Sequence, residues 1–202
     1  MVDPQNVDWA EIRERLPYGN SKEERKKRRQ MWKYIDVNGN GFVSLAEMDK
    51  GLRDVIQLDH LFDAKKVTMR AFQNSRNAEK QNANKWKNKQ YKKYSEDYIE
   101  RNELRYILKY IRRYFEYWVA FARLSDNNKS LKLDEFIAGK DELEKWVGPI
   151  DDAEAVFNEI DANGGGKILF SEWVEWAEKI KLDIDDDDDN ASADEKFEDE
   201  DN

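Results

Sequence analysis

Apolar residues recur along this chain at steps of three and four positions, a spacing that predicts amphipathic helices. The strongest pattern runs from Leu104 to Leu124 and carries a row of aromatic residues, which most often pack in a core. Shorter helices are expected from Trp9 to Leu16, from Ser21 to Ile35, through Leu52 to Ile56, from Leu61 to Phe72, from Leu133 to Trp146, from Asp151 to Ile160 and from Phe170 to Ile180. Ser21 with Glu24, and Asp151 with Glu154, are expected to cap the helices that follow them.

The most informative loop follows the second of these helices and reads D-V-N-G-N-G-F-V-S-L-A-E from Asp36 to Glu47. Ca²⁺ takes six to eight oxygens, and an EF-hand loop supplies them from positions 1, 3, 5, 7, 9 and 12. Gly41 at position 6 permits the sharp turn, because a positive φ costs little without a Cβ. The expected ligands are Asp36, Asn38, Asn40, the backbone carbonyl of Phe42, Ser44 and Glu47. With two carboxylates in this set we expect a Kd of roughly 10⁻⁶–10⁻⁴ M, with Mg²⁺ as an alternative occupant at rest.

EF-hand loops occur in pairs, because the short strand in each loop needs a partner for its backbone hydrogen bonds. The clearest further loop is Asp161–Glu172. It offers four ligands, namely Asp161, Asn163, the backbone carbonyl of Lys167 and Glu172. Gly165 and Leu169 stand at positions 5 and 9 without a side-chain oxygen, so waters would have to complete the shell. We expect this loop to bind Ca²⁺ more weakly than the first, or not at all.

Two more repeats end at Glu103 and Glu135 and have lost the leading aspartate. Counting back from Glu103 places Lys92 at position 1, where an ammonium repels a divalent ion. Counting back from Glu135 places Leu124 at position 1, whereas counting forward from Ser125 leaves that loop one residue short. Both repeats are expected to keep the fold without the metal. The residues expected to pair in the short strands are Val43, Ile99, Leu131 and Ile168.

The net charge of −9 is unevenly distributed. The segment from Asp183 to Asn202 has twelve acidic residues and one lysine, a net of −11, which leaves +2 for the rest of the chain. Such an acidic run repels itself and is expected to be disordered. Between Lys80 and Lys93 there are six lysines and no acidic residue. The chain has no cysteine and one histidine, His60, which excludes disulfides, thiol nucleophiles and Cys/His zinc sites.

These patterns predict an all-α fold of four EF-hand repeats in two paired lobes, joined by the long aromatic-rich helix. Residues 1–20 would form an amino-terminal segment with a short helix, and residues 21–112 the first EF-hand pair. Residues 113–182 would form the second pair, and residues 183–202 the disordered acidic tail. No signal peptide, membrane helix or glycine at position 2 for myristoylation is found.

Over roughly residues 9 to 185 the chain resembles the calflagin family of flagellar calcium-binding proteins, and similar ciliate calcium-binding proteins. The resemblance rests on W-x-x-I-R-E-R-L-P at Trp9–Pro17, S-E-D-Y-I-E at Ser95–Glu100, the aromatic helix and W-A-E-K-I-K-L-D at Trp176–Asp183. It implies a four-EF-hand calcium sensor of a flagellum or cilium. Calflagins look anchored by lipids on an amino-terminal glycine and cysteine, which this chain lacks, so no lipid anchor is expected. The family also looks to bind calcium mainly through its third and fourth hands, whereas here the first is intact.

The leading hypothesis is therefore a cytoplasmic Ca²⁺-responsive protein of a cilium or flagellum that acts through protein–protein contacts, with tubulin or other axonemal proteins as candidate partners. The alternative is a scaffold component of the ciliary axoneme or cytoskeleton, in which the hands serve as a packing module. Lys80–Lys93 would then meet an acidic partner, although a solvated loop, or contact with the protein's own acidic tail, is the more common explanation of such a segment. An enzyme is not expected, because no phosphate-binding glycine loop, Ser/His/Asp set or acid–base pair occurs. Nucleic-acid binding is opposed by the acidic tail and by the lack of a docking motif.

Overall fold

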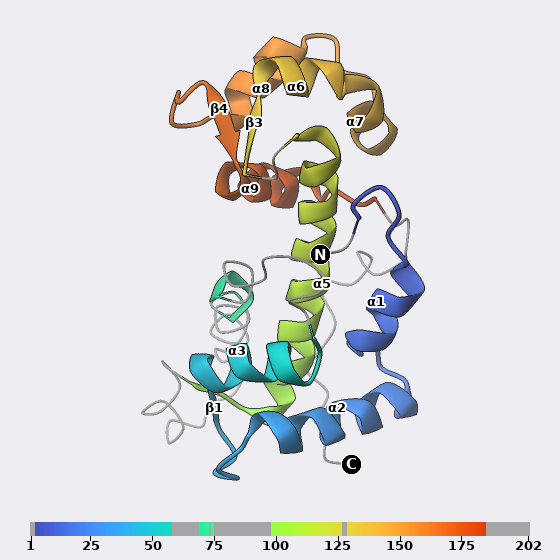
Figure 1. Cartoon of the computed structure of the whole chain (residues 1–202), viewed down its shortest axis with the longest axis vertical. Coiled ribbons are helices and arrows are strands. Elements are labelled where there is room, and N and C mark those ends of the chain that lie inside the picture. Colours follow the sequence, from blue (N-terminus) through green and yellow to red (C-terminus); the bar gives the residue numbers. More distant parts are fainter. Residues whose placement is uncertain (1–2, 58–68, 73, 75–97, 127–128, 185–202) are drawn as a thin grey trace, which may run out of the picture. The chain divides into compact units, whose positions relative to one another are not determined.

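The computed structural model describes residues 3–57, 69–72, 74, 98–126 and 129–184. Within them the chain is mostly helical, with two short antiparallel strand pairs (Figure 1). Internal contacts divide the chain into two units. The first comprises the described residues of Asp8–Arg113, and the second comprises Asp3–Val7 together with the described residues from Tyr114 onward. Helix α5 (Leu104–Leu124) contributes residues to both units and has the bounds that the apolar pattern predicts.

The first unit is built around α2 (Lys22–Ile35) and α3 (Leu45–Asp54), which pack together on either side of a loop (Figure 1). Strand β1 (Val43–Ser44) ends that loop and pairs antiparallel with β2 (Tyr98–Ile99), which precedes the short 3₁₀ helix η3 (Arg101–Glu103). Val43 lies opposite Ile99, and both side chains are fully buried. Helix α2 begins as predicted, because the Ser21 side chain accepts the backbone N–H of Glu24 at 3.2 Å.

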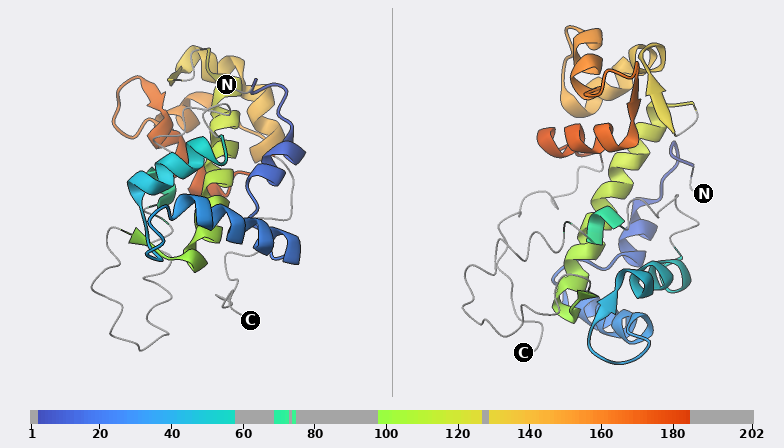
Figure 2. Two further views of the ribbon diagram at one scale, coloured as in Figure 1. Left: turned by 60° about the horizontal axis from the view of Figure 1, so that its bottom comes forward. Right: turned by 90° about the vertical axis from the view of Figure 1, so that its left-hand side faces the viewer.

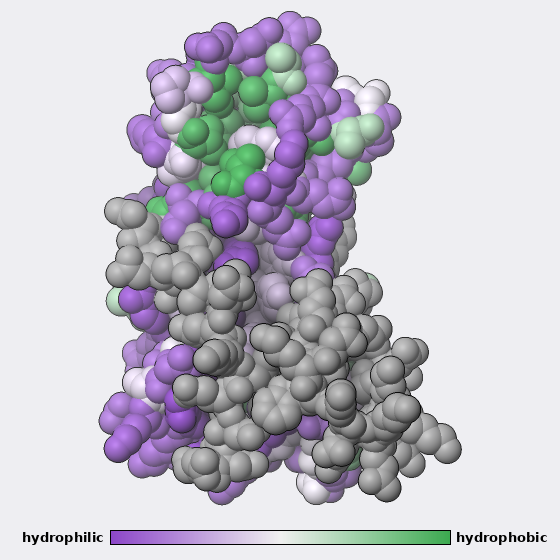
Figure 3. Space-filling view, turned by 180° about the vertical axis from the view of Figure 1, so that it is seen from behind, coloured by the Kyte–Doolittle hydropathy of each residue, from purple (hydrophilic) through white to green (hydrophobic). Residues whose placement is uncertain are grey.

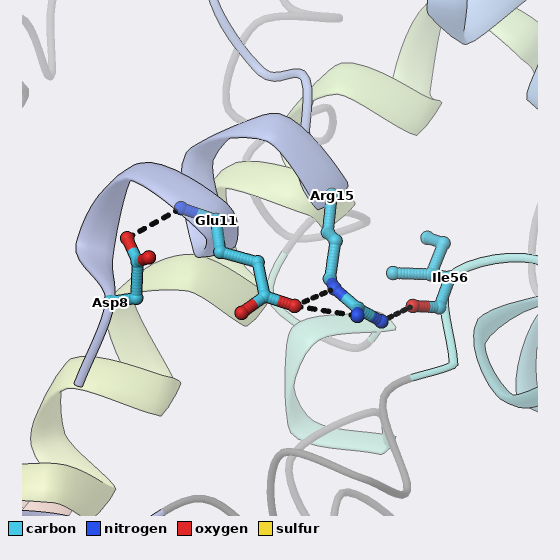
Figure 4. A network of polar contacts seen from close by, with 4 residues as sticks. All are labelled: Asp8, Glu11, Arg15 and Ile56. Atoms are coloured by element: carbon cyan, nitrogen blue, oxygen red, sulfur yellow. Dashed lines mark hydrogen bonds and ion pairs between the residues drawn. The ribbon is translucent and has the colours of Figure 1, made fainter. Parts of the chain in front are cut away.

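Helix α1 (Trp9–Arg15) is joined to the end of the α3 segment by a chain of polar contacts (Figure 4). Asp8 caps the helix by accepting the backbone N–H of Glu11 at 3.0 Å. The carboxylate of Glu11 then pairs with Arg15 at 2.6 Å, and Arg15 donates to the backbone carbonyl of Ile56 at 3.4 Å. These contacts connect α1 to the residues that follow α3.

Two arginines hold the turn between α1 and α2. Arg28 is 2 % exposed and donates to the backbone carbonyls of Pro17 and Gly19, at 2.8 and 2.7 Å. Arg105 of α5 donates to the carbonyl of Tyr18 at 2.7 Å. The buried carbonyls of this turn are therefore satisfied by guanidinium groups instead of by secondary structure.

The second unit continues from α5 through β3 (Ser130–Lys132), α6 (Leu133–Ala138), α7 (Lys140–Val147), α8 (Ala153–Ile160), β4 (Lys167–Leu169) and α9 (Phe170–Ile180). Strands β3 and β4 lie side by side and antiparallel, with Leu131 opposite Ile168 (Figure 2). Trp173 is fully buried in the core, where its indole N–H donates to the carbonyl of Tyr117 at 2.9 Å. Apolar residues also reach the surface of this unit (Figure 3).

The amino-terminal residues Asp3–Val7 pack on the second unit through Arg123 of α5. Its Nε donates to the carbonyl of Pro4 at 2.8 Å. The same guanidinium pairs with Glu142 at 3.5 Å and lies over the ring of Trp146, 5.8 Å from its centroid. One arginine thus connects the first residues of the chain to α7.

Two expectations about the second unit are wrong. The continuous helix predicted from Leu133 to Trp146 is two helices, because Gly139 interrupts it between α6 and α7. A Cβ at Gly139 would lie 2.5 Å from Cδ2 of Leu124, so the chain packs too closely there for a side chain. Helix α8 is capped by Asp152, whose side chain accepts the N–H of Ala155 at 2.9 Å, and not by Asp151.

Several predicted segments lie outside the described residues. They are most of Leu61–Phe72, His60, the lysine-rich segment Lys80–Lys93 and the acidic tail beyond Ile184.

Candidate metal centre

The loop Asp36–Glu47 connects α2 to β1 and the start of α3. Asp36 ends α2 and is 8 % exposed, whereas Asn38 and Asn40 lie at the surface. Two glycines make the reversal, Gly39 with φ +66° and Gly41 with φ +83°, and nothing lies within 4 Å of the position that a Cβ would take on either. The turn therefore depends on backbone conformation, as the Gly41 pattern predicts, and not on a close contact.

The first half of this loop is held by its own side-chain oxygens. The two carboxylate oxygens of Asp36 accept the backbone N–H groups of Asn40 and Gly41, at 3.1 and 3.0 Å. The side-chain oxygen of Asn38 accepts the N–H of Asn40 at 2.9 Å, and that of Asn40 accepts the N–H of Phe42 at 2.8 Å. The oxygens at positions 1, 3 and 5 are thus turned toward the interior of the loop.

Glu47 closes the loop from the first turn of α3. One of its oxygens accepts the side-chain N–H of Asn38 at 2.9 Å. The other accepts from the backbone N–H and the hydroxyl of Ser44, at 2.9 and 2.8 Å. The structure therefore brings position 12 together with positions 3 and 9, and half-buried Phe42 lies between Asn40 and β1 at position 7.

These residues fit a Ca²⁺ ion. Two carboxylates, two amide oxygens, a hydroxyl and a backbone carbonyl make an all-oxygen set, which is what a hard divalent cation requires. No group of three or more His, Cys, Asp or Glu side chains suited to a metal occurs in the described part of the chain. The Asp36–Glu47 loop combines two carboxylates with neutral oxygen donors.

The loop Asp161–Glu172 repeats the same framework. The oxygens of Asp161 accept the N–H groups of Gly165 and Gly166, at 3.0 and 2.8 Å. Glu172 accepts from the side chain of Asn163 at 2.5 Å and from the N–H of Leu169 at 2.9 Å. The turn has the expected form, but Gly165 and Leu169 leave positions 5 and 9 without side-chain oxygens, and Lys167 adds only its carbonyl.

The repeats ending at Glu135 and Glu103 keep the closing contact of the glutamate. Glu135 accepts the backbone N–H of Lys132 at 2.7 Å and that of Asp126 at 3.3 Å. The Asp126 contact spans nine residues, as does the backbone contact of Asn163 with Glu172, and it agrees with counting this loop back from Glu135. Glu103 accepts the N–H of Glu100 at 2.5 Å.

In the Glu135 repeat the structure offers little to an ion. Leu124, at position 1, is a buried apolar residue at the end of α5. The hydroxyl of Ser125 donates to the carbonyl of Ser130 at 2.7 Å, so the carbonyl at position 7 already has a donor. The sequence pattern did not reveal this hydrogen bond, because it depends on the folded conformation of the loop. Lys92 of the Glu103 repeat lies outside the described residues.

The described helices include none that is long and apolar enough to cross a membrane. Residues 12–111 match the family model described as the FCaBP EF-hand domain. The chain is 32 % identical to a flagellar calcium-binding protein of Trypanosoma cruzi over 184 residues, which is 90 % of this chain and 83 % of that protein. It is 34 % identical to the flagellar calcium-binding proteins TB-24 and TB-1.7G of Trypanosoma brucei brucei, over 88 % of this chain and 79 % and 75 % of theirs. These relatives are named for calcium binding and not for an enzymatic activity. The chain belongs to the flagellar calcium-binding protein, or calflagin, family.

Proposed function

We propose that this protein is a non-enzymatic Ca²⁺ sensor of a flagellum or cilium, with Asp36–Glu47 as its principal metal site. One observation carries the proposal. Glu47, at the start of α3, contacts the side chains at loop positions 3 and 9, so proposed ligands from both halves of the loop lie together. The names of its relatives support the flagellar setting.

We further propose that the chain contains four EF-hand repeats in two pairs. The strand register supports this organisation. Position 8 of the first loop, Val43, lies opposite Ile99, which is position 8 when counted back from Glu103. Leu131 and Ile168 hold the same relation in the second unit. The two degenerate loops would then serve as pairing partners for the Asp36–Glu47 and Asp161–Glu172 loops.

Calcium would act through the Glu47 carboxylate. Glu47 would hold the ion from the first turn of α3, where the ion would compete with Asn38 and Ser44 for its two oxygens and so alter this turn. Helix α3 packs on α2, so the apolar contacts between the two helices change with it. The proposed output is a contact with a protein partner, for which tubulin and other axonemal proteins are candidates, and Mg²⁺ is the proposed occupant at resting calcium.

Isothermal titration of the full-length protein tests the principal site. Glu47→Gln and Asp36→Asn should each weaken the tightest Ca²⁺-binding event by at least about tenfold, since ligand charge sets affinity in such loops. Glu135→Gln is the matched control, because it changes the same residue type at the same loop position in a repeat without the leading oxygen. If the tightest Ca²⁺-binding event has the same affinity in Glu47→Gln as in the native protein, the proposal is wrong.

The scaffold alternative is favoured by one observation. The Glu103 and Glu135 repeats keep their strand pairing although Lys92 and Leu124 replace the leading aspartate. A packing role of these repeats therefore does not require a metal ligand at position 1. Hydrogen exchange of the α3 amides separates the two functions. A sensor changes this exchange on Ca²⁺ addition in the native protein and not in Glu47→Gln, whereas a pure scaffold shows the same exchange with and without Ca²⁺.

A further inference from the structure

Helix α2 carries far more positive charge than its structural role needs. Its fourteen residues include seven lysines and arginines and two glutamates. Arg28 is buried and holds the Pro17–Gly19 turn, and Lys27 lies 3.6 Å from Glu14. Of the other basic residues of α2, the lysines Lys22, Lys26 and Lys33 are exposed.

Four basic residues of α2 form one row, which we call the α2 basic row: Lys22, Lys26, Arg29 and Lys33. Steps of four, three and four residues place them on the same side of the helix. All four are exposed, whereas Arg28, Trp32 and Ile35 mark the buried side. At 1.5 Å per residue the row extends for about 17 Å.

Within the described residues, Lys22, Lys26 and Lys33 have no acidic side chain at ion-pair distance. Neighbouring like charges on a helix repel each other, so the row costs a little stability and creates a positive potential along α2. The described residues of the first unit add to it, because they contain 17 lysines and arginines against 11 acidic residues. The acidic excess of the whole chain therefore comes from other segments.

We propose that the α2 basic row binds an acidic polypeptide segment of a partner protein. The row presents about one cation per helical turn, or one every 5–6 Å. An extended acidic chain presents side chains on one side about every 7 Å, which flexible lysines can match. This proposal does not depend on Ca²⁺ binding by Asp36–Glu47, so the two can fail separately.

A lipid surface fits the row less well. Helices that lie on bilayers insert an exposed apolar face, whereas the apolar residues Trp32 and Ile35 of α2 are buried in the protein. The positions beside the row include the exposed polar residues Glu23 and Gln30, and Tyr34 is the one large apolar side chain of α2 that is exposed. The shape and chemistry of this surface therefore favour an acidic chain in water.

Fluorescence anisotropy of a fluorescein-labelled twelve-residue Asp/Glu peptide, titrated with the full-length protein at 50–300 mM salt, tests the proposal. The variant K22Q/K26Q/K33Q should lose at least about fivefold in affinity at low salt, and the native affinity should fall as salt rises. The matched control K132Q/K145Q/K179Q removes three exposed lysines from the second unit and should change affinity less than twofold. K22R/K26R/K33R should retain binding, because it keeps the charges.

Three results would overturn the proposal. Equal peptide affinity of the native protein and K22Q/K26Q/K33Q would place the binding elsewhere, for instance on Lys80–Lys93. Row-dependent binding to phosphatidylserine vesicles without peptide binding would identify a lipid surface as the ligand. Peptide binding only after Asp185–Asp189 are changed to asparagine would show that the protein's own tail occupies the row.

Discussion

Gly51 of α3 packs directly against Ile35 of α2, so that a Cβ at Gly51 would lie 2.6 Å from Cγ1 of Ile35. Both residues are buried, and they belong to the two helices that flank the Asp36–Glu47 loop. Gly51→Ala should therefore destabilise the protein by about 1–2 kcal/mol, because overpacking outweighs the gain in helix propensity. Urea unfolding followed by circular dichroism measures this loss. Lys50→Ala, on the exposed neighbouring position, should have a much smaller effect, and equal midpoints for the two variants would contradict the prediction.

The loop Asp161–Glu172 should gain affinity when its two missing oxygens are supplied. In G165N/L169S a Cβ at residue 165 would lie 2.6 Å from the side-chain oxygen of Asn163, which is the mobile end of an exposed side chain and can turn toward an ion. We expect Ca²⁺ binding by this loop to tighten by about tenfold, since the number and kind of ligands set affinity. Isothermal titration in the Glu47→Gln background isolates this loop. No gain over Glu47→Gln alone would show that the loop cannot close around an ion.

Arg28 should be among the most sensitive residues of the first unit. Arg28→Met removes the donors to the carbonyls of Pro17 and Gly19 while keeping most of the side-chain volume. Leaving these partly buried carbonyls without donors should cost about 2–3 kcal/mol. The unfolding transition in urea gives the change, with Lys26→Met on the exposed side of α2 as the control. If both variants unfold at the same urea concentration, the two hydrogen bonds do not stabilise the turn.

Glu144 should make stability depend on pH in the acid range. The backbone N–H of Ile150, at 2.8 Å, lowers the pKa of the Glu144 carboxyl below its ordinary 4.5, and Lys140 adds to this effect. A lowered pKa in the folded state stabilises the protein above the ordinary pKa, and this contribution is lost as pH falls through the folded value.

Thermal melts of Glu144→Gln between pH 7 and pH 3 check this prediction. The melting temperature of the variant should lie below that of the native protein at pH 7, and the gap should close below about pH 4. Glu154→Gln, at an exposed position of α8, should show no such convergence. A gap that stays constant across the range would mean that the hydrogen bond matters and the charge does not.

The loops were predictable because their chemistry is local. Positions 1 to 12 of an EF-hand lie in consecutive residues, so Asp36, Gly41 and Glu47 indicate the turn, which the structure has, together with the expected ligands. The helix from Leu104 to Leu124 was predictable for a similar reason, since its apolar period is long and uninterrupted. The strand positions Val43, Ile99, Leu131 and Ile168 followed from counting back from each closing glutamate, and this count agrees with the register in the structure.

The wrong predictions concern features that depend on a contact distant in sequence, or on which of two similar neighbouring residues takes a role. Gly139 separates α6 from α7, and Leu124 occupies the space that a side chain would take there, a contact that the local pattern does not show. Asp151 and Asp152 are equivalent candidates in sequence, and only the position of the Ala155 N–H selects the second. The sequence likewise allows two numberings of the Glu135 loop, one from Leu124 and one from Ser125. The hydrogen bond between the Asp126 N–H and Glu135 agrees with the numbering from Leu124.

The guanidinium of Arg123 donates to the carbonyl of Pro4, so the second unit is assembled from two separate stretches of the chain. A recombinant fragment beginning at Tyr114 would lack Asp3–Val7 and would therefore lose the hydrogen bond between Arg123 and the carbonyl of Pro4. Affinity tags and fluorescent fusions are therefore better attached to the other end of the polypeptide.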